Sequence, residues 1–411
     1  MRVVVAGGGI GGLALALALH ERGIRATVHE RAETVRELGV GINVLPHAVA
    51  HLVRWGLLPR LDAVGIRTRE LIYRTADGRD ILRQLRGIDA GHEAPQFSIH
   101  RGLLLGLLHG AACERLGEDA VLTGQTLTAH AQDADGVTAR FDTAEGPSEV
   151  RADVLVGADG IHSALRRSRR DEGPPRWNGV VMWRGAAWHA PFLDGRTMIV
   201  AGGMRSKLVL YPVHDDPSRP GETLMNWVIC AKVAEPTDPL PHRDDWQGPG
   251  RLSDVVRHVR GVISIPELDV EALIRGTEAS WVYPMCDRDP LERWSEGRVT
   301  LLGDAAHPMY PVGSNGASQA VLDAASLAGH LAGADPVEAL AAYDAERRPA
   351  TAEIVRANRA GGPERVIDLV EERAPGGFER LEDVATKAEL EAIVGRYHTI
   401  TAPEPRAARP P

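Results

Sequence analysis

Cysteine is scarce in this chain, whose 411 residues include only Cys113, Cys230 and Cys286. The three are far apart, so the sequence has none of the paired spacings that hold zinc or iron–sulfur clusters or form redox dithiols. Intracellular proteins typically lack structural disulfides because their compartment is reducing. We therefore predict a cytoplasmic protein without disulfides and without a metal site.

Long apolar runs and an excess of positive charge are also missing. No stretch of about 18 uninterrupted apolar residues occurs, which argues against a transmembrane helix. The first apolar run is broken at once by glycines and does not predict a signal peptide. The formal net charge of -9 argues against a nucleic-acid or anionic-membrane surface. We interpret the arginine-rich run 166–170 as a solvated loop, and we expect a small-molecule partner and a monomer or homodimer.

The N-terminal stretch has the order strand, glycine turn, helix, strand and acid. The β-branched strand 2–6 runs into Gly7, Gly9 and Gly12, which match G-x-G-x-x-G. In such a turn the first glycine permits the bend, the second lets a pyrophosphate approach the backbone, and the third lets helix and strand pack closely. Glu30 lies 18 residues after Gly12, where an acid accepts hydrogen bonds from an adenosine ribose. The order predicts a dinucleotide site.

Two later strands also end in an acidic residue. The apolar run 153–157 leads to Asp159, and the run 297–302 leads to Gly303-Asp304. A helix is expected at 318–331, after a Pro/Gly-rich loop. An acid at a strand end followed by a helix N-terminus suits a polar, partly anionic ligand. Asp159 also fits a helix N-cap, and for His307 we favour a role in loop structure over acid/base chemistry.

Residues 180–229 contain consecutive strands without helices between them, which predicts an antiparallel sheet. Only 4% of the chain is aromatic, yet several aromatic residues fall in or beside these strands. They form either the walls of a flat apolar pocket or the core of the sheet. The candidate substrate residues are Trp183, Arg184, Tyr211, Trp227, Tyr283, Met309 and Tyr310. Arg184 fits a structural salt bridge, which we favour, or a substrate carboxylate.

Together these motifs resemble the FAD-dependent single-component aromatic hydroxylases, the family of p-hydroxybenzoate and salicylate hydroxylases. The resemblance covers about residues 1–360. The runs 182–185 and 309–320 most resemble a phenazine-modifying monooxygenase of this family. The family implies α/β plus α+β architecture, with a Rossmann-like FAD-binding domain and an antiparallel-sheet substrate domain. We predict an FAD-binding domain of residues 1–70, 98–175 and 281–360, a substrate domain of 71–97 and 176–280, and a C-terminal helical segment and tail of 361–411.

The resemblance also implies roles for individual residues. Asp304 is expected to bind the ribityl chain, and Pro311 to face flavin and substrate with its backbone. The backbone amides of Asn315, Gly316 and Ala317 are expected at the flavin N1/C2=O edge. The full predicted cofactor set is Gly7, Gly9, Ile10, Gly11, Gly12, Glu30, Arg31, Gly41, Arg101, Gln125, Asp159, Gly160, Gly303, Asp304, Pro311, Gly313, Asn315, Gly316 and Ala317.

The implied activity is hydroxylation of an aromatic or polycyclic small molecule, in secondary metabolism or aromatic catabolism. FAD is the expected cofactor, NADH or NADPH the electron donor and O2 the oxidant, by way of a flavin C4a-hydroperoxide. No tyrosine pair for activating a phenol can be assigned from the sequence. Two alternatives remain: the same fold performing epoxidation, Baeyer–Villiger oxidation or reduction, and a flavin-binding protein without turnover.

Overall fold

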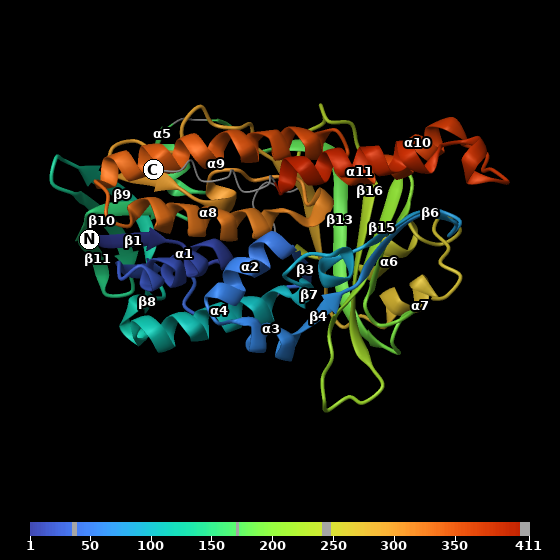
Figure 1. The fold of residues 1–411 in the computed structure, drawn as a ribbon, viewed down its shortest axis with the longest axis horizontal. Helices are drawn as coiled ribbons and strands as arrows, with labels where there is room; N and C mark the ends of the chain where they lie inside the picture. The colour runs from blue at the N-terminus through green and yellow to red at the C-terminus, as the bar shows by residue number, and fades with distance from the viewer. Residues whose placement is uncertain (35–38, 170–171, 241–247, 403–411) are drawn as a thin grey trace.

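The computed structural model describes residues 1–34, 39–169, 172–240 and 248–402 (Figure 1). At the N-terminal end, five strands form a parallel sheet. Their order across the sheet is β19 (Val299–Leu301), β12 (Val154–Gly157), β1 (Arg2–Ala6), β2 (Arg25–His29) and β8 (Val121–Leu122). Ligands of open parallel sheets bind beyond the carboxyl ends of the strands, and β1, β12 and β19 end at the three predicted motifs.

Helices pack against this sheet and against each other. The first, α1 (Ile10–Glu21), is buried along residues 12–19, because it lies between the sheet, α4 (Arg101–Leu116) and α8 (Gly316–Leu331). A helix that is apolar all round is typical of such a fully enclosed position. Above α8 runs the long α9 (Pro336–Arg359) (Figure 1).

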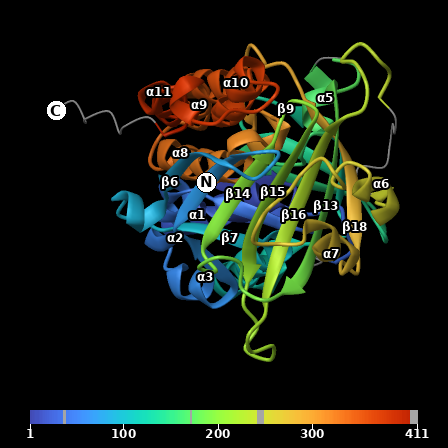
Figure 2. The same ribbon diagram turned by 90° about the vertical axis from the view of Figure 1, so that its right-hand side faces the viewer.

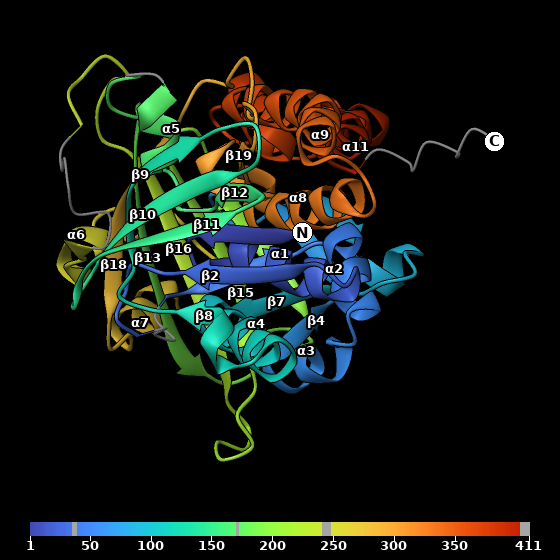
Figure 3. The same cartoon turned by 90° about the vertical axis from the view of Figure 1, so that its left-hand side faces the viewer.

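Two small sheets and several short helices complete this half of the molecule. One sheet, β9 (Thr126–Gln132), β10 (Val137–Thr143) and β11 (Gly146–Ala152), lies at the outer end of the molecule (Figure 3). The other comprises β3 (Gly41–Val44), β7 (Gln96–His100) and β4 (Gly65–Thr68). The short helices are α2 (Pro46–Arg54), α3 (Leu58–Val64) and α5 (Ala164–Arg169), with 3-10 turns at Gly87–Ala90, Glu118–Ala120, Gly303–Ala305, Val312–Ser314, Gly362–Glu364 and Leu381–Asp383.

An eight-stranded sheet forms the other half, and Figure 2 views it. Its order is β17 (Gly248–Pro249), β18 (Ser280–Asp287), β13 (Arg176–His189), β16 (Thr223–Lys232), β15 (Ser206–His214), β14 (Thr197–Gly202), β5 (Glu70–Thr75) and β6 (Asp80–Leu85). All pairs are antiparallel except β14 with β5. The predicted antiparallel sheet is therefore present. Strand pairing places β18 in this sheet, whereas the predicted domain boundary put residues 281–287 with the FAD-binding part.

The two faces of the eight-stranded sheet are covered by different elements. On one face, α6 (Leu252–Val256) and α7 (Val270–Arg275) pack on the side chains of β13, β16 and β15. On the other face, α10 (Arg365–Arg373) and α11 (Lys387–Thr401) cover the end formed by β5, β6 and β14 (Figure 2). The rest of that second face looks toward the parallel-sheet half.

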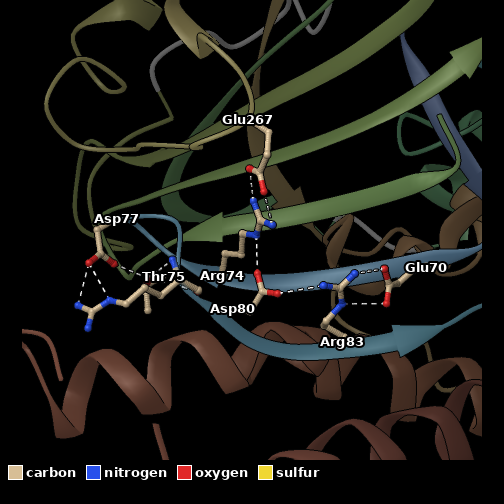
Figure 4. Close-up of polar contacts among 8 residues, drawn as sticks. Glu70, Arg74, Thr75, Asp77, Asp80, Arg83 and Glu267 are labelled. Atoms are coloured by element: carbon tan, nitrogen blue, oxygen red, sulfur yellow. Dashed lines mark hydrogen bonds and ion pairs between the residues drawn. The ribbon is translucent and has the colours of Figure 1, made fainter. Parts of the chain in front are cut away.

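An ion-pair network ties the β5–β6 hairpin to the loop before α7 (Figure 4). Arg74 is 4% exposed, and its guanidinium donates to Asp80 at 2.7 Å and to Glu267 at 2.7 and 3.0 Å. Arg83 donates to Glu70 and Asp80 at the hairpin surface. Each nitrogen of the Arg74 guanidinium donates to a carboxylate. The buried arginine is tolerated because its charge is paired.

Two further sequence expectations have outcomes in the fold. The run 166–170 was expected to be a solvated loop. Arg166 and Arg169 instead belong to α5 and donate to buried carbonyl groups, so the expectation is wrong for these two residues. Arg170 lies outside the described residues. Of the C-terminal segment, residues up to 402 form α10, α11 and short turns, and the tail 403–411 lies outside the described residues. No described helix has the length and apolarity needed to cross a membrane.

Candidate active site

A cavity of about 1010 Å³ lies where the carboxyl ends of the parallel strands face the eight-stranded sheet. The parallel-sheet half lines it with the turn after β1, the loop after β12 and the chain from β19 into α8. The eight-stranded sheet lines it with side chains of β13, β15, β16 and β18. The cavity therefore joins all three predicted acid and glycine motifs to the predicted substrate sheet.

The glycine turn after β1 requires glycine at two positions for different reasons. Gly7 has φ +113°, and a Cβ there would overlap the Ala158 carbonyl group at the end of β12. A Cβ on Gly12 would overlap the Gly7 carbonyl, so only glycine lets α1 pack this closely on β1. A Cβ on Gly9 would meet nothing within 4 Å, and Gly9, Ile10 and Gly11 line the cavity. Open space over a helix N-terminus suits a phosphate group.

Glu30 lies beside the glycine turn, at the end of β2. Its Oε2 accepts a hydrogen bond from the Gly8 amide at 2.7 Å, and its Oε1 accepts one from the Ala32 amide at 2.9 Å. The Gln125 amide donates to the Glu30 carbonyl oxygen at 2.8 Å. Glu30, Gln125 and the exposed Arg31 lie outside the set of residues that lines the cavity. The structure thus places Glu30 against the glycine turn and Gln125 against Glu30, both outside the cavity lining.

Asp159 follows β12 between two cavity-lining residues, Ala158 and Gly160. Its Oδ2 accepts from the Ala164 amide at 2.6 Å, at the start of α5. The N-cap position of α5 is occupied by Ser163, whose hydroxyl accepts from the Arg166 amide at 3.0 Å, so the N-cap interpretation of Asp159 is wrong. Its Oδ1 is buried and has no hydrogen-bond partner among the described residues. Burial raises the pKa of Asp159 above its usual value, against the lowering effect of its bonds to Ser163 and Ala164. An unpaired buried carboxylate oxygen is available to a ligand.

Asp304 follows β19 and is exposed to the cavity although it lies deep in the molecule. Burial raises its pKa, while the nearby His307 and Arg101 act to lower it. Arg101, the first residue of α4, also reaches the cavity. Neither side chain has a hydrogen bond or ion pair to another residue that the structure describes. Both are therefore free to bind a ligand with hydroxyl or phosphate groups.

The loop from Met309 to Asn315 delivers the chain to the N-terminus of α8. Gly313 and Ser314 both have positive φ, of 67° and 59°, which is unusual for serine. The first intrahelical bond runs from the Gln319 amide to the Asn315 carbonyl. The earlier amides, at Gly316, Ala317 and Ser318, have no acceptor within the helix and carry partial positive charge. Pro311, Asn315, Gly316 and Ala317 line the cavity, whereas Gly313 does not.

His307 belongs to a buried ionic cluster beneath this loop. Asp323 on α8 accepts from His307 Nε2 at 2.5 Å, from Arg347 Nε at 2.8 Å and from the Gly303 amide at 3.1 Å. Burial alone would raise the pKa of Asp323, but His307 and Arg347 lower it to about 2. The cluster holds the turn at Gly303 against α8 and α9. His307 does not line the cavity. Its contacts hold the loop in place, as the sequence analysis favoured.

Arg166 is a site-supporting residue that the sequence analysis missed. It is 2% exposed, and its guanidinium donates to the carbonyls of Ala305 and Ala306, directly after Asp304. It also donates to Glu172 at 2.6 Å. The signal in the sequence was its i, i+3 spacing from Ser163, whose hydroxyl accepts from the Arg166 amide. Arg166 therefore anchors the chain that presents Asp304.

Residues 183–185 on β13 show how side-chain alternation sorts the eight-stranded sheet. Trp183 points to the face covered by α6 and stacks on His258, with ring centroids 5.0 Å apart. Arg184 points to the opposite face and lines the cavity. Gly185 points back, and a Cβ there would lie 2.5 Å from the indole of Trp227 on β16. Successive side chains on a strand must alternate in this way.

The predicted substrate residues therefore divide between two faces. Arg184, Tyr211, Met309 and Tyr310 line the cavity. The structure does not bring Trp183 and Trp227 there: both are in the core on the far face, where the Trp227 indole donates to Thr277 Oγ1 at 2.8 Å. Tyr283 packs near the cavity wall but does not line the cavity. The wall contains residues that the sequence analysis missed, including Met182, Val228 and Met285.

Arg184 has no acidic partner among the described residues. One of its terminal nitrogens donates to the Gly41 carbonyl at 2.7 Å, and its Nε is buried without a partner. Tyr211 lies beside it; burial raises the pKa of this phenol to about 12, and Arg184 opposes the rise. The favoured interpretation of a structural salt bridge is therefore not what the structure contains. Gly41 also donates to Asn226 Oδ1 at 2.7 Å, so it links β3 to the eight-stranded sheet.

The site fits FAD on three observations of this structure. Space lies open over Gly9, at the start of α1, for a pyrophosphate. Asp304 and Arg101 face the cavity without partners among the described residues, as polar ligands for the chain that links pyrophosphate to flavin. The first-turn amides of α8 border the cavity, where they can meet an electron-rich ring edge. No group of residues able to hold a metal ion occurs in the described ranges.

Comparison with known proteins identifies the family. A family model described as an FAD binding domain matches residues 1–358. The chain belongs to this FAD-binding family. It is 46% identical over 371 residues to phenazine 1,6-dicarboxylic acid hydroxylase PhzS of Lysobacter antibioticus, covering 87% of this chain and 89% of that protein. It is 35% identical over 397 residues to 3-amino-4-hydroxybenzoate 2-monooxygenase PtnB3 of Streptomyces platensis, covering 93% and 94%.

A solved structure agrees with these relatives. Klebsiella pneumoniae HpxO in complex with FAD and uric acid matches with a TM-score of 0.74 at 25% identity, covering 97% of this chain and 96% of that one. The predicted hydroxylase family, its two-part fold and the use of FAD, NAD(P)H and O2 are confirmed. The chain is an FAD-dependent aromatic monooxygenase. Nothing found favours epoxidation, Baeyer–Villiger oxidation, reduction or a protein without turnover.

Proposed function

We propose that this monooxygenase hydroxylates a flat aromatic acid, with a fused ring such as a phenazine as the first class to test. The observation that carries the proposal is Arg184, a cavity-lining arginine without an acidic partner among the described residues. An arginine in that position matches a carboxylate by paired hydrogen bonds. The two relatives named above are both named for carboxylated aromatic compounds.

The apolar wall supports the same proposal. Met182, Val228, Met285 and Tyr310 pack together beside Arg184 and present a largely apolar surface to the cavity. A flat ring gains stability from such a surface, while one charged end fixes its orientation. Methionine side chains adapt to rings of different outline. Arg184 would therefore set which edge of the ring faces the cofactor.

For FAD we propose the following assignment of residues. Gly7 to Gly12 with the N-terminus of α1 hold the pyrophosphate, Glu30 with Arg31 and Gln125 the adenosine ribose, and Asp304 the ribityl hydroxyls. Arg101 and Gly41 contact the linker, and Asp159 with Gly160 closes the site beside it. Bound FAD supplies the electrons from NAD(P)H and the activation of O2. The chain binds, orients and shields: the amides of Asn315, Gly316 and Ala317 stabilise negative charge on the ring, and the Pro311 backbone faces the substrate.

Turnover under O2 tests the substrate proposal. Purified protein with FAD and NADH or NADPH is incubated with a panel of phenazine carboxylates, hydroxybenzoates and their uncarboxylated analogues. We expect a carboxylated member to stimulate NAD(P)H consumption and to give a product 16 mass units heavier, one oxygen atom. Turnover that proceeds without O2, or preference for uncarboxylated rings, would contradict the proposal.

Asp304→Ala tests the cofactor assignment. Asp304 reaches the cavity without a partner among the described residues, so its removal should leave the fold intact and lose the hydrogen bonds to the ribityl chain. We expect FAD affinity to fall about 10- to 100-fold, the range for hydrogen bonds to a charged group. Titration of apo-protein with FAD measures it, and Asp304→Asn serves as the conservative control. An Asp304→Ala protein that binds FAD with the Kd of wild type would show the assignment to be wrong.

We further propose that the enzyme works in the cytoplasm on a small molecule, without nucleic acid, as a monomer or homodimer. The net charge of -9 and the three unpaired cysteines support this. Light scattering on a size-exclusion column distinguishes monomer from dimer, and a larger assembly would contradict the proposal.

A further inference from the structure

The C-terminal helix α11 reaches the loop that precedes α8, although it lies beyond the residues matched by the family model. Tyr397 on this helix is 4% exposed. Its hydroxyl donates to Asn358 Oδ1 at 2.6 Å, accepts from Asn315 Nδ2 at 2.9 Å and lies 3.1 Å from the Val312 carbonyl oxygen. One buried hydroxyl thus joins α11, α9 and the N-cap of α8.

The Tyr397 ring is as closely fitted as its hydroxyl. A Cβ on Gly313 would lie 2.5 Å from the Tyr397 ring, and a Cβ on Gly362 would lie 3.2 Å from its other edge. The ring therefore occupies a slot between the loop that precedes α8 and the turn before α10. The tyrosine ring fits because both positions are glycine, and a side chain at either position would crowd the ring.

Other side chains bond the same loop at further positions. Asn358 Nδ2 donates to the Tyr310 carbonyl at 2.8 Å, and Asn315 Nδ2 donates to the Gly313 carbonyl at 3.0 Å. Gln319 on α8 donates to the Thr401 carbonyl at the end of α11, at 3.0 Å. The carbonyls of residues 310, 312 and 313 are thereby bonded to Asn358, Tyr397 and Asn315, whose side chains meet at the Tyr397 hydroxyl.

The loop needs such support because its backbone is unfavourable. Ser314 has φ +59°, a left-handed conformation that an L-residue adopts at a cost of about 1–2 kcal/mol. A residue persists in such a conformation only where its surroundings determine it. Ser314 is followed at once by the amides of α8 that border the cavity. The position of those amides thus depends on how firmly the loop is held.

We propose that Tyr397 is a positioning residue for the flavin: through Asn315 and Asn358 it holds the loop in the one conformation that aims the first-turn amides of α8 at the cofactor. α11 is then a functional part of the FAD site. Helix N-terminal amides favour negative charge, and reduced flavin is anionic, so this positioning stabilises the reduced form relative to the oxidised form. The inference rests on the FAD of the family and not on the identity of the substrate.

Tyr397→Phe tests the inference, because it keeps the ring in its slot and removes only the hydroxyl. Without it, Asn315 Nδ2 and Asn358 Oδ1 lose a buried partner. We expect apo-protein to bind FAD about 10-fold more weakly, and the reduction potential of bound FAD, measured without substrate, to become more negative. Flavin fluorescence titration and a spectroscopic redox titration against a dye give the two values.

Two variants on the same helix serve as controls. Thr399→Val changes an exposed residue and should leave both values unchanged. Val394→Ala removes buried side-chain volume from the packing of α11 without touching the loop, and reproduces any general loosening of the helix. Tyr397→Phe protein with the affinity and potential of wild type would overturn the inference. So would Val394→Ala protein of equal stability with the same shift in potential. Since no substrate is present, these outcomes are independent of the aromatic-acid proposal.

Discussion

The two faces of the eight-stranded sheet carry opposite kinds of side chain on the same strands. The face toward α6 and α7 has Trp183, Trp227 and the aliphatic residues around them, and the Trp227 indole donates to Thr277. The face toward the cavity has Arg184 with a buried, unpartnered Nε and an adaptable wall of methionine and valine. β13 and β16 thus place one face in a packed core and the other face at the cavity.

The largest effect should come from the far face, through Trp227→Ala. Removing the indole leaves a cavity over Gly185 and removes the hydrogen bond that the indole donates to Thr277, and we expect about 3–5 kcal/mol less free energy of unfolding. Urea denaturation followed by circular dichroism measures it. Trp227→Phe keeps a ring over Gly185 and should lose about 1 kcal/mol, mainly the hydrogen bond. A loss below about 1 kcal/mol in Trp227→Ala would show that the far face is not the stabilising one.

On the cavity face, Arg184→Met should lower activity and leave stability nearly unchanged. Hydrogen bonds to a charged group contribute about 1.5–3 kcal/mol, so kcat/KM for a carboxylated substrate should fall about 10- to 100-fold, mostly through KM. The free energy of unfolding should change by less than about 1 kcal/mol, because Arg184 loses its bond to the Gly41 carbonyl and its contact with Tyr211 but no ion pair among the described residues.

Matched substrates and a conservative variant check the cause. An amide or ester analogue of the same ring should lose little activity in Arg184→Met, since it has no charge to pair. Arg184→Lys keeps the positive charge but not the planar guanidinium, so its kcat/KM for the acid should lie between those of wild type and Arg184→Met. An equal fall in kcat/KM for the acid and the amide would mean that Arg184 supports the structure of the site and does not bind the carboxylate. The two faces of the sheet would then not differ in role.

The smallest effect concerns the thiols, one on each face. Cys230 lines the cavity and Cys286 belongs to the far-face core. Burial raises the pKa of both to about 12. The thiolate is the reactive form and its fraction grows only as pH approaches the pKa, so both should remain unmodified by iodoacetamide from pH 7 to 9. Mass spectrometry of a Cys113→Ala protein measures this, with denatured protein as the reactive control. Rapid labelling of Cys230 at pH 8 would mean that the cavity face exposes its thiol to solvent.

Much of the cofactor side could be read from local sequence. Gly7 and Gly12 are required by backbone contacts within a few residues or with the adjacent strand, and such contacts leave a fixed spacing. Asp159 and Asp304 are found because a parallel sheet places strand ends together. The predicted pocket aromatics succeeded only in part, since Trp183 and Trp227 are core residues. The period-two alternation of β13 separates Trp183 from Arg184, but it does not say which of them faces the cavity.

The sequence by itself determined the dinucleotide turn, the two strand-end acids, the antiparallel sheet and the family, because each depends on short-range geometry that a few residue types satisfy. Only the tertiary structure decided which sheet face meets the cavity, that Arg184 lacks an acidic partner among the described residues, and that Tyr397 bonds Asn315, 82 residues earlier. These depend on how distant elements pack. Packing is the sum of many weak contacts across the chain, and no single spacing in the sequence records it.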